Sequence, residues 1–566
     1  MHRAPSRALL RALNPSTGSL ICRRCLGTAS SLRRNAELQS TTTRNETPQP
    51  LRKQIKEETR ARKEAKRSQK SDLTSKDPRL EKWELTVGIE IHAELSTAHK
   101  LFSSAQTSLS ATPNTHVAPF DAALPGTQPT FQAATLLPAL RAALALNCHI
   151  QRKSSFDRKH YFWWDQPNGY QITQYYEPFA KNGRITLYKH DDIDPDDGDE
   201  ITIGIKQIQM EQDTAKTVAQ PPTTQLLDFN RVSHPLIEII TLPQIHSPKT
   251  AAALVRKIQA ILKAVNANTT GMEMGGLRAD VNVSVRDKYA QAGSATLEYA
   301  GVKGLGQRTE IKNLSSFKAV EDAIIAERER QISVLEAGGI IEGETRGWAL
   351  GSTETKRLRG KEGEVDYRYM PDPDLGAVII GDDLLIHLRD NMPMLPDESI
   401  KLLTEDPKYG LTIKDARTMV ALDDGNRLDY FLETFAILDE TLDKQHSARA
   451  KLGKTVANWV LHDIPTSLAA TDGVFPYTAL SNGNSTAPIL ADILLHMLRN
   501  EITTPTARHL LSILSEDPPR HIADVIDAES LRLIQMTDEE YEILAQAVVD
   551  SSDDMDAVSP SERRRH

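Results

Sequence analysis

The stretch VGIEIHAEL, residues 87–95, alternates apolar and polar residues along its whole length. Successive side chains of a β-strand point to opposite faces, so the alternation predicts a strand whose apolar face packs into a core. Its other face would carry Glu90, His92 and Glu94. Such a face is either solvated or forms a binding site, and a single strand by itself favours the solvated face. The other predicted strands are needed to decide between a solvated face and a binding site.

Further segments repeat this pattern. ADVNVSVR (279–286) alternates valines with polar residues, IQMEQDTAK (208–216) and RTEIKNL (308–314) space their charges in the same way, and HPLIEII (234–240) holds one carboxylate in an apolar run. A carboxylate in that setting is costly unless it is paired or binds a cation. The carboxylates on these segments are Glu211, Asp213, Glu238, Asp280 and Glu310.

Carboxylates from several strands predict a polar concavity of the kind that suits Mg²⁺, which prefers oxygen ligands. Cationic residues lie between them in the sequence, and such residues suit phosphate. The candidate phosphate-binding residues are Lys216, Arg231, Arg278, Arg286 and Lys312. From the residues alone we predict Mg²⁺-dependent phosphoryl chemistry on a β scaffold.

Composition narrows the class of protein. The chain has 566 residues, of which 39% are hydrophobic and 26% charged, so we expect a soluble protein with several domains. The most apolar run, AATLLPALRAALAL (133–146), is interrupted by Pro138 and Arg141. It is too short and too broken for a membrane span, so we predict none.

The first residues differ from the rest of the chain. Residues 1–36 contain seven arginines and no acidic residue, which is typical of a mitochondrial transit peptide, although a solvated basic tail is the alternative. We predict a transit peptide over 1–45 that directs the protein to the mitochondrial matrix, followed by a polar charged linker over 46–82. Cys22 and Cys25 would leave with the peptide, so Cys148 alone remains and no disulfide framework is expected.

The order of patterns predicts an α+β protein. A β-rich domain spans 83–391 and contains two helices, over 250–267 and over 316–339, the second ended by Gly338 and Gly339. AVIIGDDLLIHL (377–388) is predicted as a strand. A helical domain follows over 392–484, then a partial helical tail domain over 485–550, and residues 551–566 are predicted to be a disordered tail.

Six segments together carry a family resemblance. VGIEIHAEL resembles the first signature block of the B subunit of aspartyl/glutamyl-tRNA amidotransferase, and the other five follow in the family's order over about 83–390. These five are FDRKHYFWWDQPNGYQITQY (156–175), DFNRVSHPLIEII (228–240), MEMGGLRADVNVSVR (272–286), TEIKNLSSF (309–317) and DYRYMPDPDL (366–375). ANWVLHDI (457–464) is similar to the family's helical domain.

The resemblance implies a cradle-like catalytic domain that phosphorylates the glutamate of misacylated Glu-tRNA(Gln) with ATP and Mg²⁺. Ammonia from a separate amidase (A) subunit would then displace phosphate, and a small third subunit would complete the complex. The tail domain would bind tRNA. The catalytic residues implied by the motif match are Glu90, His92, Glu211, Glu238, Asp280 and Glu310. The first four of these are the implied Mg²⁺ ligands.

The chain departs from the family pattern at several positions. The family commonly has four zinc-binding cysteines, and this chain has Ser103, Ala105, Ala118 and Asp121 in their places, so no zinc site is expected. Gln209, Gln212 and Asn168 replace a usual histidine, acidic residue and lysine, and the tail lacks the usual Lys-rich closing helices.

These departures leave two alternative functions open: a non-catalytic scaffold that docks the amidase subunit to tRNA, and a stand-alone ATP-dependent ligase. The altered side chains and the missing tail helices favour the scaffold, whereas retention of every implied acidic position except the second of the 211–212 pair argues against it. The ligase lacks a source of ammonia. The sequence does not separate Glu-tRNA(Gln) from Asp-tRNA(Asn) as the substrate.

Residues 1–45 fused to a fluorescent protein should direct it to mitochondria, because residues 1–36 are rich in arginine and contain no acidic residue, as matrix transit peptides do. Fluorescence microscopy with a mitochondrial marker measures the location. Replacing the seven arginines with glutamine is the control and should leave the fusion in the cytosol. Cytosolic retention of the unaltered fusion would contradict the transit peptide.

Overall fold

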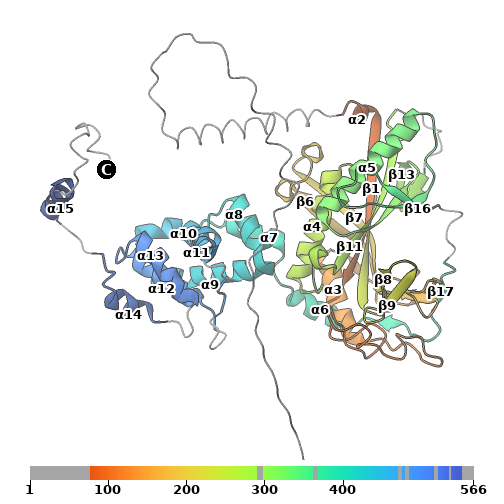
Figure 1. Cartoon of the computed structure of the whole chain (residues 1–566), viewed down its shortest axis with the longest axis horizontal. Coiled ribbons are helices and arrows are strands. Elements are labelled where there is room, and N and C mark those ends of the chain that lie inside the picture. Colours follow the sequence, from red (N-terminus) through yellow and green to blue (C-terminus); the bar gives the residue numbers. More distant parts are fainter. Residues whose placement is uncertain are drawn as a thin grey trace, which may run out of the picture. The chain divides into compact units, whose positions relative to one another are not determined.

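The computed structural model describes residues 77–289, 297–360, 367–469, 475–478, 484–515, 520–533 and 537–550. A sheet-rich region comes first along the chain and an all-helical region follows (Figure 1), which confirms the α+β class. The predicted transit peptide, most of the predicted linker and the predicted disordered tail lie outside the described residues, so these three remain predictions.

The sheet-rich region is built on nine strands in the order β16-β15-β14-β11-β1-β10-β7-β6-β2. Its five central strands are β14 (Thr309–Leu314), β11 (Leu277–Asp287), β1 (Trp83–Glu94), β10 (Pro235–Thr241) and β7 (Glu200–Gln212). Each of these pairs antiparallel with the next. The outer strands are β16 (Lys356–Gly360), β15 (Glu344–Gly347), β6 (Ala180–Tyr188) and β2 (His149–Ile150). The strands predicted from alternating patterns around 87–95, 279–286 and 308–314 all belong to this sheet.

Helices α4 (Pro248–Ala264) and α5 (Phe317–Glu336) share one hydrophobic core with the apolar face of the sheet. Ile89 and Ile91 of β1 are fully buried in this core, as the alternation predicts. Both helices begin at a serine whose side chain accepts a hydrogen bond from a backbone N–H of the first turn, which stabilises the helix start. The two predicted helices are therefore confirmed, and the core fixes which face of each strand turns away from it.

A smaller sheet, β17-β4-β5, lies against the polar side of β7. It consists of β4 (Asp157–His160), β5 (Tyr170–Thr173) and β17 (Met370–Pro371). Gln171 Nε2 donates to Glu211 Oε1 at 2.9 Å, and Gln209 Nε2 donates to Thr173 Oγ1 at 3.2 Å. These buried contacts make the small sheet a wall beside the polar face of the large one.

The remaining elements of this region are short. They are helices α2 (Arg79–Lys82) and α3 (Leu136–Ala145), the hairpins β8 (Lys216–Gln220) with β9 (Thr224–Asp228) and β12 (Leu297–Tyr299) with β13 (Val302–Leu305), and the pair β3 (Lys153–Ser154) with β18 (Val378–Ile379). Helix α2 lies at the end of the segment predicted to be a linker, so the last residues of that segment are helical.

The strand predicted over 377–388 is wrong for most of its length. Only β18 is extended, and Asp382–Asp390 form helix α6. Asp382 and Asp383 lie in its first turn, where negative charge favours the helix dipole. Leu385 and Leu388, three residues apart, are its buried residues, and this spacing is helical.

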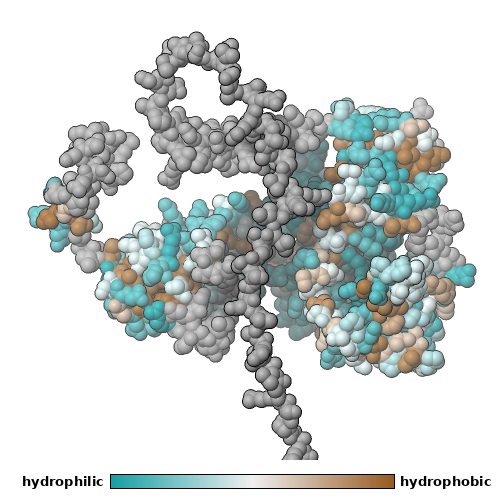
Figure 2. All heavy atoms as spheres, viewed as in Figure 1, coloured by the Kyte–Doolittle hydropathy of each residue, from teal (hydrophilic) through white to brown (hydrophobic). Residues whose placement is uncertain are grey.

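The helical region contains α7 (Pro396–Glu405), α8 (Ile413–Ala421), α9 (Asn426–Thr441), α10 (Leu452–Asn458), α11 (Ile464–Ala469), α12 (Ala487–Leu498), α13 (Thr504–Leu510), α14 (Ile522–Ala528) and α15 (Asp538–Asp550). Phe431, Leu490 and Ile526 belong to one hydrophobic core, so residues on both sides of the predicted boundary at 484 pack together. The domain boundaries remain predictions. On the visible face, hydrophobic residues are scattered among hydrophilic ones (Figure 2). Within the described ranges, every helix is too short or too polar to cross a membrane.

The four positions that correspond to the family's zinc ligands are joined by hydrogen bonds to Lys100 or Asp121, or include Asp121 itself. Lys100 Nζ donates to Asp121 Oδ2 at 2.9 Å, and both side chains are 0% exposed. Ser103 Oγ and the backbone N–H of Ala118 donate to the same oxygen, at 3.1 and 2.9 Å, and the backbone N–H of Lys100 donates to the carbonyl oxygen of Ala105. An ammonium group at the centre repels a cation, and these residues offer no thiolate. They do not fit zinc.

Asp121→Asn should lower the free energy of unfolding by about 3–5 kcal/mol, because it leaves the buried Lys100 ammonium group without its counter-charge. Urea unfolding measures the change. Asp199→Asn is the control, since the Lys189–Asp199 pair is almost fully exposed and should contribute little.

The same preparation should contain no stoichiometric zinc by elemental analysis. One zinc ion per chain, or an Asp121→Asn protein as stable as the Asp199→Asn control, would contradict the account of this loop.

Candidate functional site

The polar face of the large sheet collects acidic side chains from five adjacent strands. Residues directly opposite each other in antiparallel strands point to the same face. The register places His92 of β1 opposite Glu238 of β10, and Glu90 of β1 opposite Asp280 of β11. The neighbouring strands β14 and β7 add Glu310 and Glu211. We call this set the acidic centre: Glu90, His92, Glu211, Glu238, Asp280 and Glu310. The structure thus brings together all six predicted catalytic residues.

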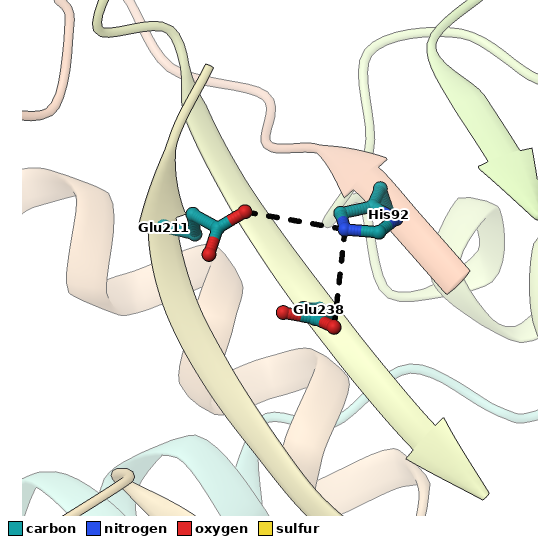
Figure 3. A group of neighbouring side chains, drawn as sticks. All are labelled: His92, Glu211 and Glu238. Carbon is teal, nitrogen blue, oxygen red and sulfur yellow. Dashed lines mark ion pairs between the residues drawn. The ribbon is translucent and has the colours of Figure 1, made fainter. Parts of the chain in front are cut away.

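Three members of the acidic centre lie close enough to share one cation. His92 Nε2 is 4.0 Å from Glu211 Oε1 and 3.9 Å from Glu238 Oε1. Figure 3 shows the imidazole directed toward both carboxylates, and ligand atoms of the three residues all lie within 4.8 Å of one another. Among the described residues, His92 Nδ1 and Glu211 Oε2 are buried and have no hydrogen-bond partner. Buried polar atoms without partners are costly, and a bound cation would engage the Glu211 carboxylate. His92 faces the two carboxylates with Nε2, so a cation held there would leave Nδ1 free to donate to another group.

The pKa shifts of Glu238 and Glu90 agree with an excess of negative charge in the acidic centre. Burial raises the pKa of Glu238 well above its usual range, and the nearby Glu211 and Glu90 raise it further. Burial also raises the pKa of Glu90, with Glu310 as the next cause. Burial lowers the pKa of His92, which favours the neutral imidazole that a metal ion needs. A divalent cation at this place would relieve the repulsion between the carboxylates.

The carboxylates of Glu211 and Glu238 supply oxygen ligands of the kind that Mg²⁺ prefers, and His92 supplies a nitrogen. Glu90 is held by Asn282, whose Nδ2 donates to its Oε1 at 3.0 Å. The donor set therefore fits a divalent cation. Which of the four predicted ligands bind it remains a prediction.

Two lysines border the acidic centre. Lys312 Nζ lies 2.8 Å from Asp280 Oδ2 and 2.8 Å from Glu310 Oε1. Burial opposes its charged form, but these two carboxylates outweigh burial and raise the pKa of Lys312. Burial likewise opposes the charge of Lys159, on β4, while Glu211 and Glu238 help to raise its pKa. Both side chains are therefore charged and face the acidic centre.

The other predicted phosphate-binding residues lie in different places. Arg278 and Arg231 both pair with Asp213, at 2.8 and 3.5 Å, beside the acidic centre. Arg286 pairs with Glu84, and its position six residues beyond Asp280 on β11 places it roughly 20 Å along the strand. Lys216 begins the exposed hairpin strand β8. The structure therefore groups Lys312 and Arg278 with the carboxylates and places Arg286 and Lys216 elsewhere.

Sequence reasoning missed Lys159, Gln171 and Asn282. Lys159 and Gln171 lie directly opposite each other in the small sheet, and both belong to the second block of the family resemblance. The block therefore marked both residues as part of the resemblance. Only the packing of the small sheet against β7 shows that Lys159 and Gln171 face Glu211.

Glu94, the third polar residue of the opening stretch, has a different environment. It is buried, and its Oε1 lies 2.7 Å from Nδ1 of His234. His234 Nε2 in turn accepts from the backbone N–H of Ser108 at 3.4 Å. Glu94 therefore anchors a loop and does not belong to the acidic centre.

A cavity of about 410 Å³ adjoins Glu90 on the polar face. Its walls include Asn282 and Ser284 of β11 and, from the β12–β13 hairpin and the residues after it, Tyr299 and Arg308. Lys206 Nζ donates to the Tyr299 hydroxyl oxygen at 3.2 Å. This volume is in the range of small-molecule sites, and the aromatic ring and the arginine suit a nucleotide.

Comparisons with known proteins agree over most of the chain. Residues 85–386 match the model of the GatB/GatE catalytic domain family. The mitochondrial B subunit of glutamyl-tRNA(Gln) amidotransferase from Ajellomyces dermatitidis is 60% identical over 500 residues, which cover 88% of this chain and 81% of that protein. The protein of the same name from Paracoccidioides lutzii is 60% identical over 502 residues, 88% of this chain and 81% of that protein. The one from Aspergillus niger is 57% identical over 513 residues, 90% of this chain and 84% of that protein.

Glu238→Gln should abolish the rise in melting temperature that Mg²⁺ produces in the unaltered protein, because it removes a charged ligand from the acidic centre. Without Mg²⁺ the variant should be no less stable than the unaltered protein, since it also removes repulsion between buried carboxylates. Scanning calorimetry with and without Mg²⁺ measures both effects.

Glu94→Gln is the matched control, a buried carboxylate outside the acidic centre, and should keep its response to Mg²⁺. A Glu238→Gln protein that Mg²⁺ still stabilises to the same extent would exclude Glu238 from the cation site.

Proposed function

Because the chain belongs to the GatB/GatE catalytic domain family, we propose that it is the B subunit of a mitochondrial glutamyl-tRNA(Gln) amidotransferase. The names of its relatives support Glu-tRNA(Gln) over Asp-tRNA(Asn) as substrate. A B subunit works within a heteromeric complex, and we propose an amidase subunit and a small third subunit as its partners in the mitochondrial matrix.

The observation that carries the proposal is the acidic centre, in which His92, Glu211 and Glu238 lie close enough to share a cation and Glu211 has a buried oxygen without a hydrogen-bond partner among the described residues. We propose that the tRNA-bound glutamate carboxylate attacks the γ-phosphorus of ATP here. ADP leaves and an acyl phosphate forms. Ammonia from the amidase subunit then attacks the acyl carbon, and inorganic phosphate departs to give Gln-tRNA(Gln).

When bound, Mg²⁺ would offset the charge on the phosphate oxygens during this transfer. The residues of the chain position the reactants. Glu211, Glu238 and the neutral His92 would hold the cation, and Glu90 lies between them and the cavity. Lys312, whose pKa is raised, stays charged and can stabilise negative charge that develops on the transferring group.

The cavity beside Glu90 is the proposed site of the nucleoside part of ATP. Tyr299 offers a ring for stacking against adenine, and Arg308 is the cationic side chain on the same wall. From this cavity the triphosphate would extend along the polar face toward Glu238. This arrangement would place the γ-phosphate at the cation.

Binding of tRNA is proposed for the helical region after about residue 390, together with partner subunits. Phosphate contacts would make that binding decrease steeply with salt. The β-rich domain would bind only the acylated end of the tRNA.

The alternative of a non-catalytic scaffold is less well supported. Gln209 replaces a usual histidine, yet its Nε2 donates to Glu238 Oε2 at 2.7 Å and so holds a member of the acidic centre. A scaffold would have no use for carboxylates crowded at a cost in a buried site. A stand-alone ligase would still need a source of ammonia.

In the purified complex, Glu90→Gln and His92→Ala should each lower ATP-dependent phosphorylation of Glu-tRNA(Gln) by about 100-fold or more, because neither replacement can supply the lost charge or ligand. Folding should be nearly intact, since both side chains lie on the face opposite the core. Glutaminase activity should persist at least partly, because that chemistry belongs to another chain.

Phosphorylation, glutaminase and transamidation are measured separately, with thermal melting as the folding control. Glu94→Gln, on the same strand and face, should retain phosphorylation. Near-normal phosphorylation by Glu90→Gln would exclude Glu90 from the catalytic site.

A further inference from the structure

Four tyrosines form an aromatic rim at the edge of the small sheet: Tyr175, Tyr176, Tyr367 and Tyr369. The rings of Tyr175 and Tyr369 are stacked, with centroids 3.9 Å apart and planes 8° apart. Tyr176 meets Tyr175 edge to face at 5.0 Å, and Tyr367 meets Tyr369 edge to face at 5.9 Å. Tyr175 is 48% exposed and Tyr176 55% exposed. Aromatic surface left open to water in this way is a candidate for recognition.

The aromatic rim is held by the backbone of the small sheet. The buried carboxylate of Asp157 accepts from the backbone N–H groups of both Tyr175 and Tyr176, at 2.8 and 3.0 Å. The Tyr176 hydroxyl donates to the carbonyl oxygen of Tyr369 at 3.4 Å. β17, which follows Tyr369, pairs with β4. The rings are therefore preorganised, which lowers the cost of binding a flat ligand.

The aromatic rim borders the acidic centre. Lys159, which faces Glu211 and Glu238, has its Nζ 5.1 Å from the centre of the Tyr367 ring. Burial raises the pKa of Tyr369, and Lys159, Glu211 and Glu238 are among the charged groups that act on it. In the small sheet Lys159 lies directly opposite Gln171, which donates to Glu211. The aromatic rim is thus joined to the acidic centre through the small sheet.

We propose that the aromatic rim is a stacking platform for the unpaired 3′-terminal nucleotides of the aminoacyl-tRNA. This inference rests on the proposed function. The reacting glutamate is esterified to the terminal nucleotide, so at least one unpaired base must lie near the acidic centre during phosphorylation. Bases of single-stranded RNA are bound chiefly by stacking on aromatic side chains, and cationic side chains often accompany them.

The composition of the surface favours RNA over a protein partner. All four rings of the aromatic rim carry hydroxyl groups, and two cations stack on rings of the small sheet: Lys159 on Tyr367, and Arg158 on Tyr170 with its guanidinium carbon 4.2 Å from the ring centre. The cores of protein interfaces are depleted in charge. A protein partner is therefore an outcome that the test must be able to detect.

The test uses the complete complex and Glu-tRNA(Gln) in which 2-aminopurine replaces the terminal adenine. Stacking quenches 2-aminopurine fluorescence, so the unaltered complex should quench the probe on binding. In Tyr175→Ala and Tyr176→Ala complexes the quench should be lost, and KM for Glu-tRNA(Gln) should rise about tenfold or more. KM for ATP and the glutaminase rate should not change.

Tyr175→Trp and Tyr175→Phe keep a flat ring and should restore both the quench and KM. Tyr289→Ala is the matched control, because Tyr289 is 77% exposed and lies just beyond the end of β11. It should behave as the unaltered protein. Thermal melting verifies that each variant is folded.

Three results would overturn the proposal: no quench with the unaltered complex, a KM within twofold of normal in both alanine variants, or loss of the amidase subunit from the purified alanine variants, which would identify a protein interface. The proposed function fails by a different result. It is contradicted if the unaltered complex leaves Glu-tRNA(Gln) unconverted in the presence of ATP and glutamine. The fluorescence quench is measured without turnover, so it tests stacking on the aromatic rim independently of that activity.

Discussion

The antiparallel register of β1 with β10 and β11 is the constraint on which the rest of the structure depends. Strand side chains alternate between faces, so a slip of one residue would exchange the buried isoleucines for the carboxylates. The core formed with α4 and α5 prevents that slip. The same hydrophobic free energy that folds the sheet therefore holds His92 opposite Glu238 and Glu90 opposite Asp280.

Burial of these carboxylates opposes folding, and the surroundings compensate for it only in part. Lys312 pairs with Asp280 and Glu310, and glutamine side chains hold Glu211 and Glu238. Burial raises the pKa of Glu238, and the repulsion that remains raises it further. A site with this residual repulsion is stabilised by a divalent cation. A bound cation can in turn attract phosphate oxygens, which connects cation binding with the proposed phosphoryl transfer. By contrast, the buried Lys100–Asp121 pair is balanced and needs no metal ion.

Much of the sheet could be predicted from the sequence, because alternation of period two is a local signal. The choice of the six members of the acidic centre came from the family resemblance. Residues 377–388 were mistaken for a strand because a short apolar run does not distinguish strand from buried helix. Arg286 lies away from the carboxylates because the face of a long strand is continuous in sequence but extends beyond one cluster of side chains in space. Lys216 lies on the β8–β9 hairpin, outside the large sheet. Lys159 and the aromatic rim depend on how the small sheet packs on β7, which no local pattern encodes.

The central claim is that the tRNA-bound carboxylate receives a phosphoryl group at the acidic centre. Transfer of oxygen tests it most directly. Glu-tRNA(Gln) labelled with ¹⁸O in the side-chain carboxylate is converted by the complete complex with ATP, Mg²⁺ and glutamine, and the phosphate released is analysed by mass spectrometry. The account predicts one ¹⁸O atom in the phosphate for each labelled Gln-tRNA(Gln) formed. Gln-tRNA(Gln) formed together with unlabelled phosphate would contradict it.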